Sequence, residues 1–128
     1  MPAEWAPHRG TWLSWPHRES SWPGRFEPVP RAFAEIVRAL REREEVHINV
    51  VDDAMEAGAR AVLRDARIPS ENVFFHHHPT NDAWCRDHGP IFVQRLRDGR
   101  MDSIVVDWGF NAWGGKYPPF DDDDVIPT

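Results

Sequence analysis

The chain has little cysteine, no long apolar run and no excess of basic charge. Each of these absences excludes a class of protein. One Cys among 128 residues cannot form an intrachain disulfide, which excludes a small secreted scaffold held by disulfides. No stretch reaches the roughly 18 consecutive apolar residues that a membrane-spanning helix needs. The first residues also show no basic-then-apolar secretory signal. We therefore expect a cytoplasmic protein with no membrane partner.

Basic residues are outnumbered, with 15 Lys and Arg against 21 Asp and Glu, for a net charge of −6. Nucleic acid is therefore not expected as a partner, because phosphate binding needs a basic face. An acidic chain with seven Trp suits a cationic ligand, since carboxylates attract cations and indole faces hold them. Acidic charge also serves solubility alone, and charge by itself does not separate these two roles.

The length suits one modest domain rather than two. Residues 11–15 predict a short strand. Pro30 is well placed to open a helix, and an apolar stripe with a 3.6-residue period follows it. The stripe consists of Val29, Phe33, Ile36, Val37 and Leu40. Val46, Ile48 and Val50 alternate with polar residues and predict a strand.

A second helix is predicted after Asp53 and Glu56, which have capping-box spacing. It is expected to end at Ile68-Pro69, and a short buried strand is expected at residues 73–75. Residues 91–96 and 101–108 predict a hairpin, because Asp-Gly between two apolar runs favours a tight turn. Residues 111–128 look irregular. This alternation of strands and helices predicts an α/β or α+β fold.

Residues 81–90 combine two carboxylates, an Arg, a His, a Cys and a Trp in a loop between two strands. A carboxylate binds a guanidinium through two parallel N–H···O bonds, and an indole can cover its planar face. Trp84 and Asp87 could do this for one ligand. The alternative is a self-satisfied loop in which Asp87 pairs with Arg86 and Trp84 packs in the core.

Cys85 and His88 suggest a nucleophile and its base, but a lone Cys is more often a small buried hydrophobe, and we favour that interpretation. In the segment 111–117, Trp113 is either a second aromatic wall or part of a structural turn. Both alternatives remain open from spacing alone.

Two further runs suggest metal sites that we do not favour. In the His run at 76–78 only His76 and His78 can converge, because neighbouring residues of a strand point to opposite faces. Solvated or packed histidines are therefore expected rather than a zinc site. The four Asp residues 121–124 lack the spaced ligands of a calcium loop, so a solvated charge run is expected. No metal ligand is assigned.

Three longer motifs carry a resemblance to a known family. They lie at residues 1–16 (MPAEW and TWLSWP), 80–90 (TNDAW, RD and GP) and 106–119 (VDWGFNAWGGKYPP). They resemble agmatine deiminase, of the family shared with bacterial peptidyl-arginine deiminases. The resemblance implies a pentein α/β-propeller of five strand–helix modules. It also implies hydrolysis of agmatine to N-carbamoylputrescine and ammonia, on the route to putrescine, with no metal or organic cofactor.

In this family a Cys thiolate attacks the guanidinium carbon, a His moves protons and two Asp hold the guanidinium. Asp87 matches the first of these Asp, and Trp84 matches a Trp that lines the substrate site. Trp113 is a weaker candidate for substrate binding. Cys85 does not match the nucleophile, because it occupies the variable place in Trp-x-Arg-Asp.

The resemblance implies that family members are much longer, with His-x-Asp and the nucleophile further along. Residues 1–128 are therefore expected to be the N-terminal portion of one pentein domain, roughly the first two of five modules. We expect the chain alone to be inactive and to expose apolar faces through which it self-associates.

Agmatine is the favoured substrate. Peptidyl-arginine deiminases carry arginines for a substrate carboxylate after the Val-Asp strand, whereas no Arg follows Arg100 here. The alternatives are a peptidyl-arginine deiminase, a non-catalytic module that binds guanidinium or polyamine cations, and a purely structural fragment.

Overall fold

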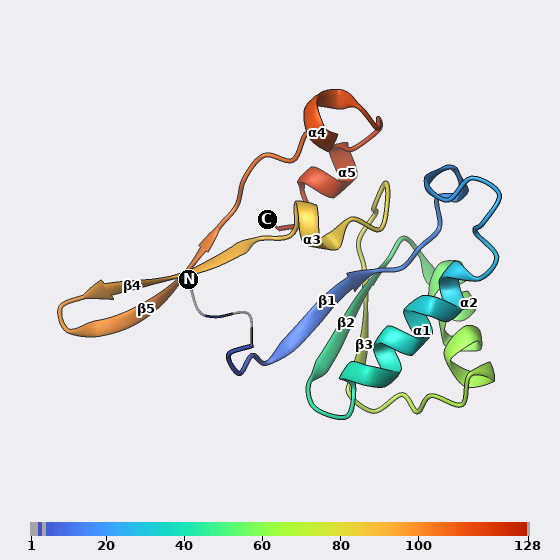
Figure 1. Cartoon of the computed structure of the whole chain (residues 1–128), viewed down its shortest axis with the longest axis horizontal. Helices are drawn as coiled ribbons and strands as arrows, with labels where there is room; N and C mark the ends of the chain where they lie inside the picture. The colour runs from blue at the N-terminus through green and yellow to red at the C-terminus, as the bar shows by residue number, and fades with distance from the viewer. Residues whose placement is uncertain (1–2, 4, 128) are drawn as a thin grey trace.

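The structure is a computed structural model that describes residue 3 and residues 5–127, so most of the first motif's MPAEW lies outside the described residues. Two sheets and several helices make a mixed α/β fold, as expected (Figure 1). A parallel sheet has the order β1-β2-β3, with β1 at Gly10–Ser14, β2 at Glu45–Val50 and β3 at Val73–His77. A separate antiparallel pair joins β4 (Ile91–Arg97) to β5 (Arg100–Val106).

Helix α1 spans Val29–Leu40 and begins one residue before the predicted Pro30, which lies in its first turn. Its buried face is centred near Val37 and includes Ala34. The predicted stripe is wrong at Ile36, which is 42% exposed. The physical reason is the helical rotation of 100° per residue, which turns Ile36 away from a face centred on its neighbour.

Helix α2 spans Asp53–Asp65 and starts one residue earlier than the predicted cap implied. The N-cap is Asp52, whose carboxylate accepts a hydrogen bond from the backbone N of Met55 at 2.8 Å. Asp53 is thus the first helical residue, and Glu56 bonds Arg60 and His77 instead of completing a capping box.

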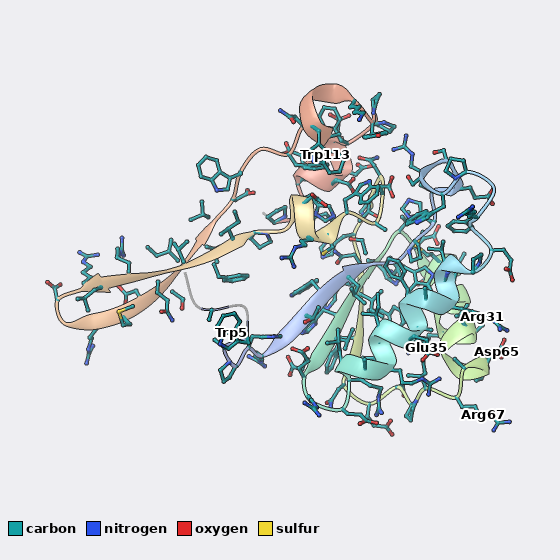
Figure 2. The ribbon with its side chains drawn as sticks, viewed as in Figure 1. Trp5, Arg31, Glu35, Asp65, Arg67 and Trp113 are labelled. Atoms are coloured by element: carbon teal, nitrogen blue, oxygen red, sulfur yellow. The ribbon has the colours of Figure 1, made fainter. Side chains whose placement is uncertain are left out.

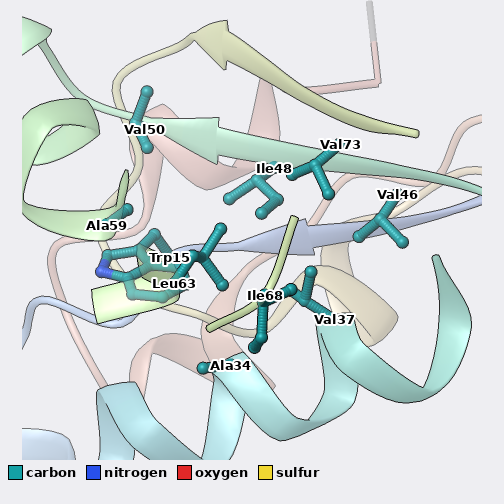
Figure 3. Close-up of a cluster of buried hydrophobic side chains, with 10 residues drawn as sticks. All are labelled: Trp15, Ala34, Val37, Val46, Ile48, Val50, Ala59, Leu63, Ile68 and Val73. Carbon is teal, nitrogen blue, oxygen red and sulfur yellow. The ribbon is translucent and has the colours of Figure 1, made fainter. Parts of the chain in front are cut away.

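The core lies between α1, α2 and one face of the parallel sheet (Figure 3). Val46, Ile48 and Val50 of β2 are fully buried there, as their alternation predicted. Burying side chains of this size contributes about 1.5–3 kcal/mol each. The remaining buried members are Trp15, Ala34, Val37, Ala59, Leu63, Ile68 and Val73.

The opposite face of the sheet is called the open face, because its side chains Trp12 and Phe74 are 46% and 43% exposed. The register places Trp12, His47 and Phe74 side by side on this open face. Phe74 is exposed, so the expectation of a wholly buried strand at 73–75 is wrong for this residue. Strand β3 is an edge strand with helices on one face only, so its side chains point alternately into the core and away from it.

The predicted hairpin is confirmed. Asp98 and Gly99 both have positive φ (51° and 74°), as the tight turn between twisted strands requires. The hairpin extends away from the parallel sheet and its helices (Figure 1). Phe92, Leu96 and Met101 are exposed along it.

Short helical turns account for the rest: η1 (Glu19–Ser21), α3 (Cys85–His88), α4 (Ala112–Gly115) and α5 (Asp121–Asp124). The four-Asp run forms α5, and Asp123 in it is only 1% exposed. The expectation of a wholly solvated charge run is therefore wrong, because tertiary contacts bury its third member. Among the described residues, no helix is long and apolar enough to cross a membrane.

Candidate functional site

The segment between β3 and β4 is placed at the carboxyl end of the parallel sheet. Its helical turn α3 packs against β1. Below it lie Ser14 and Asn49, which are fully buried at the ends of neighbouring strands. The Ser14 side chain interacts with the Cys85 thiol and lowers its pKa, at the place where α3 packs on β1. Functional loops commonly occupy this end of a parallel sheet.

Beside this segment is a hollow of about 640 Å³, here called the aromatic hollow. Its walls come from the loop after β1, from the segment before α3 and from the turn at α4. The side chains that matter to the argument are Arg18, Asp82, Trp84, Trp113, Lys116 and Tyr117. Residues about 100 positions apart therefore meet in one concave surface.

The two aromatic residues predicted to bind the substrate, Trp84 and Trp113, are in contact in the structure. Their ring centroids are 5.7 Å apart and their planes meet at 84°, an edge-to-face contact. Trp22 stacks on the other side of Trp84 at 6.2 Å, and Tyr117 packs edge-on against Trp113 at 5.9 Å. Trp113 is 50% exposed, so half of its surface stays accessible despite these contacts.

A tight turn presents Trp113. Its own φ is 57°, and Gly114 and Gly115 follow with φ of 81° and 75°. Glycine adopts this left-handed backbone without steric cost. The Asn111 side chain accepts a bond from the backbone N of Gly114 at 2.9 Å and closes the turn. Figure 2 shows Trp113 at the turn of α4, in the C-terminal part of the chain.

Asp82 is a carboxylate that lines the aromatic hollow, and no role was assigned to it from the sequence. It is 2% exposed and accepts bonds from the Ser21 hydroxyl and from the backbone N of Ala83. Arg18 lies 4.0 Å away through its Nη1. Asp82 is therefore already engaged by internal partners.

Asp87, the predicted guanidinium carboxylate, does not line the aromatic hollow. It lies on the exposed side of α3, and its backbone N bonds the carbonyl of Trp84 at 2.8 Å. Within the part of the chain that the structure describes, its carboxylate forms no hydrogen bond or ion pair, so the alternative pairing with Arg86 is not observed. The Asp87 carboxylate is exposed and acts on the neighbouring His88 through its charge.

Cys85 and His88 do not form a nucleophile–base pair in this structure. Burial raises the pKa of the Cys85 thiol to about 11, with the nearby charge of Asp123 adding to it, while the Ser14 bond works against the rise. His88 is 2% exposed, and neither of its ring nitrogens has a hydrogen-bond partner among the described residues. Burial lowers the pKa of His88, against the opposing pull of Asp123. The thiol thus lacks the features of an activated nucleophile.

Two members of the histidine run, His76 and His78, lie near each other on the open sheet face, whereas His77 between them bonds Glu56 of α2. His76 bonds His47 at 3.0 Å, and Trp12 stacks against both rings at 4.6–4.7 Å. His76 and His78 lie with their ring centroids 6.5 Å apart. No group of three or more ligating side chains suited to a metal ion occurs among residues 3 and 5–127.

Sequence reasoning found Trp84 and Trp113 but missed other members of the aromatic hollow, among them Arg18, Asp82, Lys116 and Tyr117. Lys116 and Tyr117 follow Trp113 in the same turn, so a local signal existed for them. Arg18 had none, because its neighbours in the hollow are distant in sequence. Its Nη2 bonds the carbonyl of Pro118, a hundred residues away, at 2.7 Å.

Comparison with known proteins identifies relatives over the whole chain. The family described as Porphyromonas-type peptidyl-arginine deiminase matches residues 1–128. Agmatine deiminases from Ectopseudomonas mendocina (strain ymp) and Pseudomonas aeruginosa (strain LESB58) are each 40% identical over 98% of this chain and 33% of their own length. The chain therefore spans about a third of the length of the curated relatives it matches.

Solved structures agree with this. The X-ray structure of a candidate agmatine deiminase superposes with a TM-score of 0.81 at 34% identity, covering 99% of this chain and 34% of that one. A Cys-to-Ser variant of C. jejuni agmatine deiminase with substrate bound has a TM-score of 0.71 at 30% identity, over 95% and 33% of the two chains. Both share the fold described above.

Proposed function

Because the chain belongs to the Porphyromonas-type peptidyl-arginine deiminase family, we propose that it carries the first part of an agmatine deiminase site. The complete reaction would hydrolyse agmatine to N-carbamoylputrescine and ammonia, in the cytoplasm and on the route to putrescine. Residues 1–128 would be the N-terminal portion of one pentein domain and supply about two of its five modules. No cofactor or nucleic-acid partner is part of this proposal.

One observation carries the binding role: Trp84 and Trp113 meet in one aromatic hollow, and Asp87 follows Trp84 by three residues on the exposed side of α3. Agmatine is a flat guanidinium cation joined by an aliphatic chain to an ammonium group. Asp87 would take two guanidinium N–H donors in parallel, and the Trp84 and Trp113 rings would cover the chain and the cation. Asp82 is the weaker candidate for this role, because Ser21, Ala83 and Arg18 already occupy it.

We propose that this chain binds agmatine without turning it over. Cys85 is the only thiol among its 128 residues, and its raised pKa of about 11 leaves little thiolate near neutral pH. The Ser14 hydroxyl and the sheet beneath it hold Cys85 as a packed side chain. A covalent attack on the guanidinium carbon therefore has no suitable nucleophile in these residues.

Lys116 favours a second candidate, a deiminase that acts on peptidyl-arginine. Its ammonium lies 5.2 Å over the Tyr117 ring and lines the aromatic hollow beside Arg18. A cation there could pair with a carboxylate or carbonyl that arginine has and agmatine lacks. The expectation of agmatine as the substrate rested on the absence of Arg after Arg100 and did not weigh Lys116.

Calorimetry with the 128-residue chain tests the proposal. Asp87→Asn should weaken agmatine binding by about tenfold or more, because a charged bidentate contact contributes about 1.5–3 kcal/mol. Asp65→Asn, a matched change of an exposed carboxylate on α2, should leave binding within about twofold. Equal binding by Asp87→Asn and the unmodified chain would exclude Asp87 as the guanidinium partner.

Two parallel measurements separate the alternatives. If N-acetyl-arginine binds more tightly than agmatine, and Lys116→Met removes that preference, the peptidyl-arginine candidate is favoured. A colorimetric assay for the ureido product should detect none from agmatine, and turnover that is lost in Cys85→Ala would overturn the assignment of Cys85 as a packed residue.

A further inference from the structure

Helix α5 and the start of the segment that carries Trp84 and Asp87 hold each other by reciprocal hydrogen bonds. The Asn81 side-chain oxygen accepts from the backbone N atoms of Asp122 and Asp123 at 2.8 and 3.4 Å. In return, one Asp123 carboxylate oxygen accepts from the backbone N atoms of Asn81 and Asp82 at 2.8 and 3.3 Å. Each partner thus satisfies two backbone donors of the other, over a separation of about 41 residues.

Backbone bonds connect the anchored residues to the candidate site. The Asp82 carboxylate caps the backbone N of Ala83 at 2.7 Å. The carbonyl of Trp84 then accepts from the N atoms of Asp87 and His88 at 2.8 and 3.1 Å. Only the peptide bond between Ala83 and Trp84 joins these two bonded parts of the segment, so the placement of Asn81 and Asp82 limits where Trp84 can lie.

The buried electrostatics support this anchoring role. Asp123 is 1% exposed, and burial raises its pKa while the two backbone N–H bonds oppose the rise. His88, which is also buried, interacts with Asp123 through its charge. A buried carboxylate is costly unless donors compensate it. The donors to Asp123 are the backbone N–H groups of Asn81 and Asp82, which precede Trp84. The negative charge of Asp123 is therefore stabilised only while these two residues stay in place.

We propose that Asp123 is a positioning residue, whose carboxylate sets the start of the 81–88 segment and thereby fixes where Trp84 and Asp87 meet a cationic ligand. The inference rests on the proposed function for its ligand. Asn81 is the reciprocal partner in this arrangement. Asp121 of the same run is exposed and takes no part in it.

The test compares Asp123→Ala with Asp121→Asn, which changes a neighbouring but exposed carboxylate. Asp123→Ala should raise the agmatine dissociation constant about tenfold or more, since buried N–H groups lose a charged acceptor. It should also speed amide hydrogen exchange at Asn81, Asp82 and His88 by about tenfold. Asp121→Asn should change each quantity by less than about twofold.

Two further variants distinguish positioning from loss of the fold. Asp123→Asn keeps the shape and an acceptor oxygen, so it should keep the melting cooperative and weaken binding less than Asp123→Ala does. The double variant Asn81→Ala/Asp123→Ala should weaken binding by less than the sum of the single effects, because both belong to one set of bonds.

The outcomes separate this inference from the proposed function. If the unmodified chain binds no agmatine, the proposed function fails, and the exchange rates alone decide the role of Asp123. If agmatine binds and Asp123→Ala alters neither its binding nor the exchange at Asn81 and Asp82, the positioning role is refuted. Full additivity in the double variant would also refute it.

Discussion

The raised pKa of Cys85 makes a quantitative prediction about thiol reactivity. A shift from 9.0 to about 11 lowers the thiolate fraction near pH 8 about 100-fold. A thiolate of higher pKa is intrinsically the better nucleophile, by about 6- to 10-fold for two units of pKa. The net expectation is a reaction with a disulfide reagent that is about tenfold slower than for an ordinary thiol, and partial burial slows it further.

The assay uses Ellman's reagent, which reacts by thiol–disulfide exchange, with the folded chain and with the same chain unfolded in urea. Because the chain has one Cys, the unfolded sample is an internal reference. The folded rate should keep rising with pH beyond 9, and Ser14→Ala should slow it further, since the Ser14 bond is what lowers this pKa. A folded rate equal to the unfolded one, or a plateau below pH 9, would refute the reasoning.

Three further predictions concern stability and association. Ile48→Ala should lower the free energy of unfolding by about 2–5 kcal/mol in urea titrations, whereas Ile36→Ala, on the exposed side of α1, should cost less than about 1 kcal/mol; equal losses would contradict the assigned core. The pKa of His88 is lowered in the folded chain, so the unfolded chain takes up a proton first as the pH falls below 6.5. The free energy of unfolding should therefore fall by up to about 1.4 kcal/mol for each pH unit. If His88→Gln leaves the dependence of that free energy on pH unchanged, this prediction is wrong. The exposed hairpin should drive the proposed self-association, so Phe92→Ser with Leu96→Ser should lower the sedimentation-average mass; an unchanged mass would place the contact elsewhere.

Local patterns predicted most elements of the fold correctly. Alternation at Val46, Ile48 and Val50 was sufficient for a buried strand, and Asp98-Gly99 was sufficient for the hairpin turn. These signals are reliable because period and turn chemistry act within a few residues. The errors at Ile36 and at the α2 cap are shifts of one position, which depend on the packing partner and on the backbone of the cap.

The candidate site could be predicted only in part. Trp84 and Trp113 were chosen from separate motifs, and the structure places them in contact. The sequence did not indicate that Asp82, rather than Asp87, lines the aromatic hollow. Both carboxylates lie in the same short segment, and the turn of α3 decides which of them points inward.

The amino-acid pattern alone was enough to establish a mixed α/β chain with a motif-rich segment before a hairpin, because short-range backbone preferences and apolar spacing are written into neighbouring residues. It could not reveal that Asp123 lies buried against Asn81, or that Arg18 reaches Pro118. Contacts between residues 40 to 100 positions apart depend on how the elements pack in three dimensions, and burial in those contacts is what turns a run of acids into an anchored carboxylate.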